Sequence, residues 1–351
     1  MLIVATYFFA FMLYLLSFFD DDFLRLTRKY IFFLVFLFSF LLLAFLETTI
    51  DYSGYEKYYD DVATLTNYNF DILFNLSILM FKFFSIPFEL FYHCVGLWNF
   101  ILLVVITYTF FETERERIIF LLCYLSFAFL LKDLVQMRNS LAIKYFLLSL
   151  YFYFKDKKVP FFLLYLAAIF THNSLFMFAP LFLIGKRVRV TFFILIIVYG
   201  LFVAFYFLDL LSSVLDMIPS TTGRVDDYLK MVSRELDGLS LFHFTRLCFY
   251  LFFFWAYLRK ESDTMIQFLL LCIVLGYLIR VCFIDFSLLS GRLAENAFVL
   301  ESVLLSHIIC LPCKKFDRLF KYGFLLLYCA IYLYMIFNNT PFIDTYRNFL
   351  F

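Results

Sequence analysis

Residues 88–111 read FELFYHCVGLWNFILLVVITYTFF, an apolar run of 24 residues. About 20 apolar residues in a helix cross the hydrocarbon core of a bilayer, which is about 30 Å thick, so this run can cross alone. Comparable runs recur along the chain, and the candidate spans are residues 2–19, 31–46, 88–111, 118–131, 140–154, 190–208, 241–258, 264–282, 297–311 and 322–337. We therefore predict an all-α, polytopic integral membrane protein with about 10 full spans, in one transmembrane domain over residues 1–351.

The composition agrees with this class. Hydrophobic residues make up 65% of the 351 residues and the mean hydropathy is +0.91, whereas soluble domains are about half apolar. Charged residues make up only 16%, and the formal net charge is +1. Because there is no basic excess, we expect no nucleic-acid partner. The first run lacks a basic start and a small-residue cleavage site, so we expect it to remain as a span.

Two apolar stretches differ from simple spans. Residues 71–86 mix polar with apolar positions and stop at Pro87, which suits an amphipathic helix in the membrane interface. Residues 160–184 are broken by the polar string at 171–174, so each arm is too short to cross alone. Because cations flank both arms, we predict a re-entrant or short helical hairpin with His172 at its tip.

The orientation follows from the lysines and arginines of the short loops, which mark the cytoplasmic face. With this topology, 17 of the 29 basic residues gather on one face, namely Arg25, Arg28, Lys29, Arg115, Arg117, Lys155, Lys157, Lys158, Lys186, Arg187, Arg189, Arg259, Lys260, Lys314, Lys315, Arg318 and Lys321. The opposite, outer face then holds a Tyr-rich loop with the interfacial helix at 47–87 and a long loop at 209–240, together with 132–139, 283–296 and the tail from 338. A working surface for a hydrophilic substrate is therefore expected outside.

Ionisable side chains within apolar segments are costly and are candidates for function until a structural role is found. On the outer side they are Arg138, Lys144, His172, Arg246, Arg280 and Arg292. The bias is cationic, whereas proton and cation transporters usually place Asp or Glu at this depth, and Glu301 is the main acidic exception.

The first outer loop contains Asp51, Tyr55, Tyr58 and Asp60 at helical spacing. Tyrosines at this density offer flat, amphipathic surfaces with a hydroxyl, which suit stacking and hydrogen bonding with sugars. The alternative is an aromatic belt at the membrane interface, where tyrosine is common.

Arg138 opens a span in the string RNSLAIK, and His172 lies in FTHNSLF. A guanidinium can donate two hydrogen bonds to the oxygens of a phosphate and stays charged, so Arg138 suits a diphosphate. The alternative is that Arg138 is an arginine at a helix end whose side chain snorkels to the membrane interface. A neutral imidazole at a hairpin tip can take a proton from a sugar hydroxyl. The alternative for His172 is a core histidine bonded to Asn173 or Ser174.

Further cations flank the other outer segments. Arg280 and Arg292 border the loop at 283–296, and Arg224 lies in the long loop. Arginines that converge from separate loops would form an anion site. Cys310 and Cys313 form a single CxxC, which indicates a helix end rather than zinc, since zinc would need a second pair or histidines. We expect no metal there.

Taken in order, these features resemble the EpsG family, whose members are similar to Wzy-type polymerases of bacterial surface polysaccharides. The resemblance covers nearly the whole chain. It is carried by the Tyr-rich loop with Asp51, Tyr55 and Tyr58, by the polar helix start at 69–74, by RNSLA at 138–142, by the small-residue helix that ends at His172 in 168–174, and by Arg292 and NNTPF at 338–342.

The resemblance implies a glycosyltransferase-C-like fold and a polymerase. Because no metal site is evident in the sequence, we predict that this polymerase is metal-independent and has no cofactor. It would act on undecaprenyl diphosphate-linked oligosaccharide in the bacterial inner membrane, with the active site facing the periplasm or exterior. Membrane lipid, a chain-length regulator and a flippase of the same pathway would be its partners. His172, or alternatively Asp51 or Asp60, would be the base, and the substrate would be bound by Arg138, Arg280, Arg292, Arg224, Tyr55, Tyr58, Asn139 and Asn173.

Two other functions fit the same features. A flippase for the same lipid-linked sugars would show internal repeats, and none is visible in the sequence. A membrane acyltransferase that modifies the sugar would use His172 with Asn173 as its base. The reaction product distinguishes the three.

Overall fold

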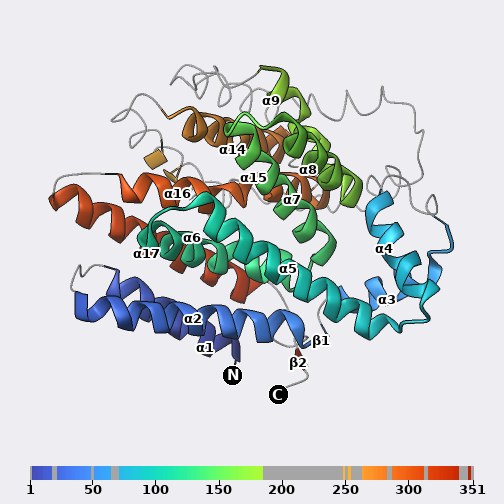
Figure 1. Ribbon diagram of the computed structural model, residues 1–351. Coiled ribbons are helices and arrows are strands. Elements are labelled where there is room, and N and C mark those ends of the chain that lie inside the picture. The colour runs from blue at the N-terminus through green and yellow to red at the C-terminus, as the bar shows by residue number, and fades with distance from the viewer. Residues whose placement is uncertain are drawn as a thin grey trace. The chain divides into compact units, whose positions relative to one another are not determined.

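The computed structural model describes residues 2–17, 22–48, 51–64, 71–184, 248–249, 252–253, 263–282, 287–311, 315–339 and 347–348. The elements that these residues form are helices apart from one short pair of strands, which confirms the all-α class (Figure 1). The predicted span 190–208, the loop 209–240 with Arg224, and most of 241–258 lie outside the described residues, as do 65–70 and 340–346.

The chain divides into two compact units. Unit 1 comprises Met1–Phe176 and Leu305–Phe351, and unit 2 comprises Met177–Leu304. The helix α16 (Leu300–Cys310) begins in unit 2 and ends in unit 1.

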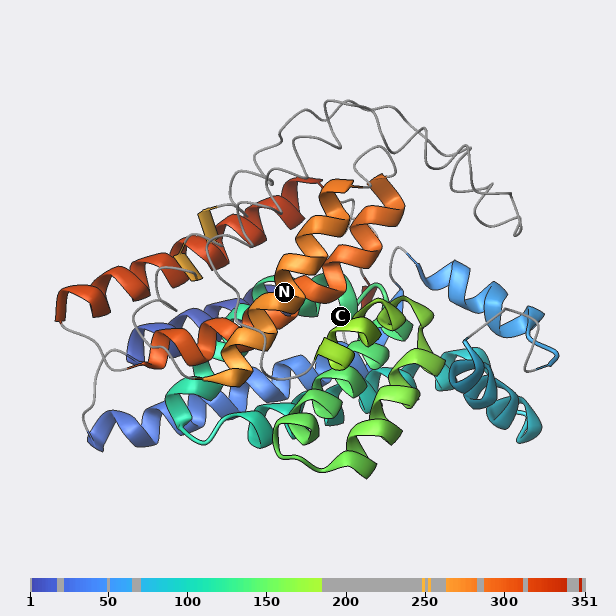
Figure 2. The ribbon, with the colours of Figure 1, turned by 90° about the horizontal axis from the view of Figure 1, so that it is seen from above.

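Three long helices start unit 1. Helices α1 (Leu2–Leu16) and α2 (Asp22–Ala44) lie side by side, as both views show, and α5 (Phe88–Phe110) packs against α2 (Figures 1 and 2). Gly96 makes the close approach of α5 possible, because a Cβ added there would lie 2.1 Å from the Leu43 carbonyl oxygen. Small residues at such crossings let membrane helices approach closely.

After α2, the chain forms the only strand pairing among the described residues. Strand β1 (Leu46–Thr48) pairs antiparallel with β2 (Arg347–Asn348). This pairing joins the start of the Tyr-rich loop to residues near the end of the sequence.

The Tyr-rich loop contains α3 (Tyr52–Asp61), and the interfacial segment contains α4 (Ile72–Phe83). Tyr59 of α3 is buried against Phe88 and Phe91 of α5, with ring centroids 5.7 and 5.2 Å apart. Asn75 of α4 is fully buried, and Lys82 Nζ donates to the backbone carbonyls of Asp60 and Val62. The exposed side chains of α4 are apolar, namely Ile72, Leu76, Met80 and Phe83. An apolar exposed face suits contact with lipid.

Helix α6 (Glu114–Tyr124) begins with a capping box, in which Thr113 Oγ1 accepts from the Glu116 N–H and Glu116 Oε2 accepts from the Thr113 N–H. It continues as the π-helix η1 (Leu125–Asp133), in which the Leu134 N–H donates to the Phe129 carbonyl. After a short turn, α7 (Met137–Phe154) begins. The sequence placed 132–139 in an outer polar segment, but Lys132 and Asp133 are buried at the end of η1.

Helices α7 and α8 (Lys158–Thr171) pack side by side and are joined by a tight turn in which Asp156 has a φ of 57°. The end of α8 therefore lies beside the start of α7. The helix stops before His172, as predicted, and η2 (Asn173–Phe178) comes next. The Tyr165 hydroxyl donates to the Leu175 carbonyl at 3.1 Å, so the second arm begins by turning back along α8.

The end of α16 and α17 (Lys315–Asn339) complete the described part of unit 1. His307 Nδ1 lies 3.4 Å from Glu116 Oε1, and the His307 ring packs on Phe111. The hydrogen bond that the His307 side chain donates to the Glu116 carboxylate is the main reason why the pKa of Glu116 falls to about 2. These contacts give His307 a structural role between α16 and α6.

Unit 2 contains α9 (Ala179–Ile184), α14 (Thr264–Cys282) and α15 (Ser287–Phe298). Phe182 of α9 stacks on Phe268 of α14, with ring centroids 5.4 Å apart. Gly276 of α14 faces Ala297 of α15, where an added Cβ would come within 2.2 Å of the alanine Cβ.

Three described helical segments are long and apolar enough to cross a membrane, namely Leu26–Ala44, Phe88–Phe110 and Leu293–Cys310. Shorter apolar helices occur at Ile3–Leu16, Ile72–Phe83, Lys158–Thr171, Asn173–Leu183 and Thr264–Arg280. The protein is therefore a helical membrane protein, and the count of about 10 full spans stays a prediction.

Candidate functional site

The central residue of the candidate site is Asp71, which is only 3% exposed. Its Oδ2 lies 2.8 Å from Arg138 Nη1, and its Oδ1 lies 3.6 Å from His172 Nδ1. A buried carboxylate thus lies between a guanidinium and an imidazole that come from distant parts of the sequence. We call Asp71, Arg138 and His172 the charged cluster.

Three elements bring the charged cluster together. Asp71 immediately precedes α4, and its carbonyl accepts the Asn75 N–H at 2.9 Å. Arg138 is in the first turn of α7. His172 directly follows α8 in an extended conformation (φ −156°, ψ 114°), and its N–H donates to the Ala168 carbonyl. Because α7 and α8 pack side by side around a tight turn, the first turn of one meets the end of the other.

The Tyr-rich helix α3 forms one wall of the site. The Arg138 guanidinium lies over the Tyr58 ring, 5.3 Å from its centroid, and the Phe74 ring is 5.9 Å away. Such contacts stabilise a cation beside an aromatic face. The Tyr55 hydroxyl accepts the Arg138 backbone N–H at 3.3 Å, and the Tyr58 hydroxyl donates to Asn75 Oδ1 at 2.5 Å. The structure therefore brings Tyr55, Tyr58 and Arg138 together.

A second cation, Lys132, lies near the charged cluster. It is 1% exposed at the end of η1, and its Nζ donates to Gln136 Oε1 at 2.7 Å. Asn139 Nδ2 donates to the same oxygen at 3.2 Å. Counting Arg138 and Lys132 against Asp71, the formal charge here is +1 while His172 is neutral. This balance favours an anion.

Burial lowers the pKa of His172 below its usual value of 6.5. The Asp71 carboxylate opposes this effect, while the charges of Arg138 and Lys132 lower the pKa further. His172 is therefore neutral at pH 7 and can accept a proton. Its side chain is 19% exposed.

Behind the site, Lys144 has a structural role. Its fully buried Nζ lies 2.6 Å from Asp133 Oδ1 and also donates to Asn99 Oδ1 and Ser140 Oγ. The Tyr124 hydroxyl donates to the same Asp133 oxygen at 2.9 Å. This network connects α5, α6, η1 and α7, and it fixes α7 against η1 just behind Arg138.

The remaining predicted residues lie in several places. Asp51 is half-buried just before α3, Asp60 is exposed on α3, and Asn173 is exposed next to His172. Arg280 is half-buried near the end of α14, and Arg292 lies in α15, so both belong to unit 2. Arg224 lies outside the described residues. The convergence of the arginines of unit 2 with Arg138 therefore stays a prediction.

The sequence alone does not select two residues of the site. Its pattern indicates a polar residue of an interfacial helix at Asp71 and part of an outer loop at Lys132. A signal for Asp71 is present, because an acidic residue precedes an apolar helix within the string that carries the family resemblance. Its partners are 67 and 101 positions away, so no local spacing could identify them.

Comparison with known proteins identified one family. A family model described as the EpsG family matches residues 29–349. Neither the curated proteins nor the solved structures contained a match.

Proposed function

The chain belongs to the EpsG family of Wzy-like polysaccharide polymerases, and on this premise we propose that it polymerises the repeat units of a surface polysaccharide. The growing glycan is transferred from undecaprenyl diphosphate to the non-reducing end of a new lipid-linked repeat unit. The observation that carries the proposal is the charged cluster, in which Asp71 lies between Arg138 and His172 beside the tyrosines of α3.

The cations of the site suit the leaving group of this reaction. An acceptor hydroxyl attacks the anomeric carbon, a new glycosidic bond forms, and the bond between that carbon and the diphosphate oxygen breaks. Negative charge then develops on the undecaprenyl diphosphate. Arg138 and Lys132 stabilise this charge, which fixed cations do best in a site that excludes water. Arg280 and Arg292 would add to this effect if unit 2 brings them near.

His172 is the proposed base that takes the proton of the acceptor hydroxyl. In this role, the Nδ1–H of His172 is directed at Asp71, so the lone pair of Nε2 is left for the substrate. Asp71 then stabilises the imidazolium that forms. The 3.6 Å separation of Nδ1 and Oδ1 is longer than a hydrogen bond. Such contacts often tighten only when substrate binds.

Tyr55 and Tyr58 suit recognition of the sugars, since both are half-buried beside Arg138 and carry hydroxyls next to aromatic faces. Asn139 and Asn173 flank Arg138 and His172 in sequence and supply amide groups. In this proposal the fold is glycosyltransferase-C-like, and the site faces the outside of the bacterial inner membrane.

The test is the length of the glycan made by purified protein in nanodiscs from a lipid-linked repeat unit. We expect His172→Gln and Asp71→Asn to lower the rate of chain extension by about 100-fold or more, because general base catalysis contributes about 10²–10⁴-fold. Arg138→Lys keeps the charge but loses the paired hydrogen bonds, so it should retain partial activity, whereas Arg138→Gln should not.

His93→Gln provides a matched control on α5, and it should leave chain length unchanged. Equal chain lengths for wild type, His172→Gln and Asp71→Asn would contradict the assigned roles. Wild-type protein that adds an acyl group, or that only moves the lipid across the membrane, would contradict the polymerase itself.

A further inference from the structure

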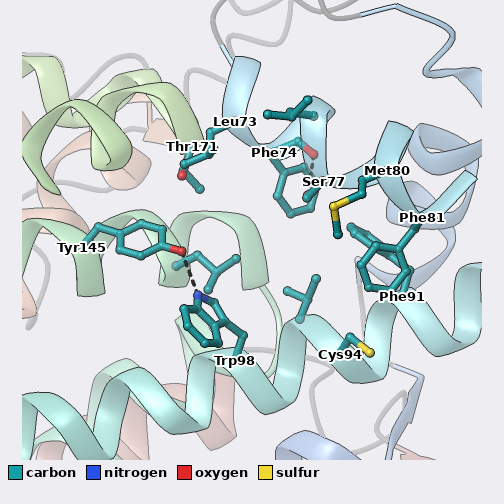
Figure 3. Close-up of a pocket in the computed structure, with 13 residues that line it drawn as sticks. Leu73, Phe74, Ser77, Met80, Phe81, Phe91, Cys94, Trp98, Tyr145 and Thr171 are labelled. Carbon is teal, nitrogen blue, oxygen red and sulfur yellow. Dashed lines mark hydrogen bonds between the residues drawn. The ribbon is translucent and has the colours of Figure 1, made fainter. Parts of the chain in front are cut away.

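Unit 1 contains a pocket, whose lining residues Figure 3 shows. Its volume is about 490 Å³. Its walls come from α4, α5, α7 and the end of α8. The largest side chains that line it are Phe74, Phe81, Phe91, Trp98 and Tyr145. The volume falls within the range of about 300–1,000 Å³ that is typical of small-molecule sites.

Three of the polar side chains in the pocket wall donate hydrogen bonds within the protein. Trp98 Nε1 donates to the Tyr145 hydroxyl at 2.7 Å, as Figure 3 shows. The hydroxyls of Ser77 and Thr171 donate to carbonyl oxygens of their own helices, at 2.6 and 2.7 Å. A ligand is therefore offered hydrocarbon and aromatic faces, so the pocket suits an apolar group.

The pocket and the charged cluster share their walls. Phe74 lines the pocket and also faces the Arg138 guanidinium. Thr171 lines the pocket and directly precedes His172. Leu141, which lies one turn beyond Arg138 on α7, lines it as well. A molecule with an anionic head at Arg138 could therefore place the hydrocarbon next to that head in this pocket.

We propose that the pocket binds the isoprene units adjacent to the diphosphate of the polyprenyl carrier. This inference rests on the proposed function and adds a binding site for the carrier tail. The aromatic walls suit a branched, unsaturated chain, and the cationic end of the site suits its diphosphate. Leu76 and Met80 line the pocket and are about half exposed, which gives the rest of the long chain a way out to the bilayer.

The probe is farnesyl diphosphate that carries a photoreactive diazirine on its tail, bound to the full-length protein in nanodiscs. After irradiation, mass spectrometry should locate the label on residues of α4 and α5 that line the pocket. Unlabelled farnesyl diphosphate should compete, whereas oleate at the same concentration should not.

Two variants fill the pocket from different helices. Cys94→Phe on α5 and Ser77→Phe on α4 should each lower labelling at least 5-fold and raise the KM for the lipid-linked substrate. Leu97→Phe is the matched control, because Leu97 lies on α5 outside the pocket lining and is exposed. It should change neither quantity.

The outcomes separate the two proposals. Labelling elsewhere, labelling that persists in both filled variants, or equal competition by oleate would overturn the tail site, even if the wild type extends glycans. A wild type that is labelled in the pocket but does not extend glycans would overturn the polymerase and leave a polyprenyl diphosphate site.

Discussion

His172 lies among charges of both signs, so its protonation should control the reaction at low pH. As the pH falls through its pKa, which is below 6.5, the imidazole gains a proton and no longer acts as a base. We expect kcat/KM to fall on the acid side with a midpoint below 6.5.

Lys132→Met tests this assignment, because it removes one of the positive charges that lower the His172 pKa. The acid midpoint should therefore move to higher pH, in addition to any loss of rate. A fixed midpoint would show that another group controls the acid limb. Lys157→Met, an exposed change in the turn between α7 and α8, is the control and should leave the profile unchanged.

The buried pair of Lys144 and Asp133 allows a prediction for stability. Asp133→Asn leaves the buried ammonium of Lys144 without its counter-charge, and losing one partner of such a pair costs about 3–5 kcal/mol. We expect a clear fall in the thermal unfolding temperature in detergent. The double variant Asp133→Asn with Lys144→Met removes both charges and should regain most of the loss. If the single and double variants unfold at the same temperature, the pair does not carry this energy.

The sequence could identify some residues of the site and not others. Arg138 and His172 stand out because each is an ionisable group within an apolar string, and lipid makes such groups costly. Asp71 and Lys132 lie in segments that look solvated, and their burial depends on packing between helices. For the same reason the sequence could not identify Asp133 as the partner of Lys144, because its pattern places Asp133 in a polar loop.

The apolar runs of the sequence predicted the positions of the helices well, but they predicted the helix ends less well. The run 88–111 corresponds to α5 (Phe88–Phe110) and the run 264–282 to α14 (Thr264–Cys282). The run 31–46 misses the first turns of α2, because the segment Asp22–Tyr30 contains four charged residues but is still helical. Charges at a membrane surface do not stop a helix, so hydropathy marks the lipid-buried part rather than the whole element.

The contact between α2 and α5 gives a prediction at this scale. Gly96→Ala would place a methyl group 2.1 Å from the Leu43 carbonyl oxygen, so the helices must separate. Overpacking of this kind costs about 1–3 kcal/mol. We expect a lower unfolding temperature in detergent. Gly323→Ala on α17 is the control, since nothing lies within 4 Å of its added Cβ, and it should unfold at the wild-type temperature or higher.

In the whole molecule, α7 separates the charged cluster from a basic turn. Its 18 residues, at about 1.5 Å each, extend about 27 Å, close to the thickness of the hydrocarbon core. Arg138 is at its start, and Lys155, Lys157 and Lys158 come after its end. This length allows the charged cluster and the basic turn to lie at opposite faces of the membrane, and the outer position of the cluster stays a prediction.

Cysteine labelling tests that orientation. In a background without the eight native cysteines, Gly54→Cys on α3 should react with a membrane-impermeant maleimide in intact cells. Lys157→Cys, in the basic turn, should react only after the membrane is permeabilised. Both positions are exposed, so accessibility within the fold is comparable. The reverse pattern would place the charged cluster in the cytoplasm.

The π-helix η1 has a further consequence, which concerns chain length rather than chemistry. Its hydrogen bonds run from residue i to i−5, as between Gln136 and Leu131 at its end, so this stretch holds more residues per turn than an α-helix. Deleting one residue would remove one step of this winding, so the side chains after the gap would turn relative to those before it. Lys132 near the charged cluster and Asp133 beside Lys144 would then both face elsewhere. A single-residue gap here would thus disable the protein although every side chain with a role remained, so the length of this helix is itself a functional trait.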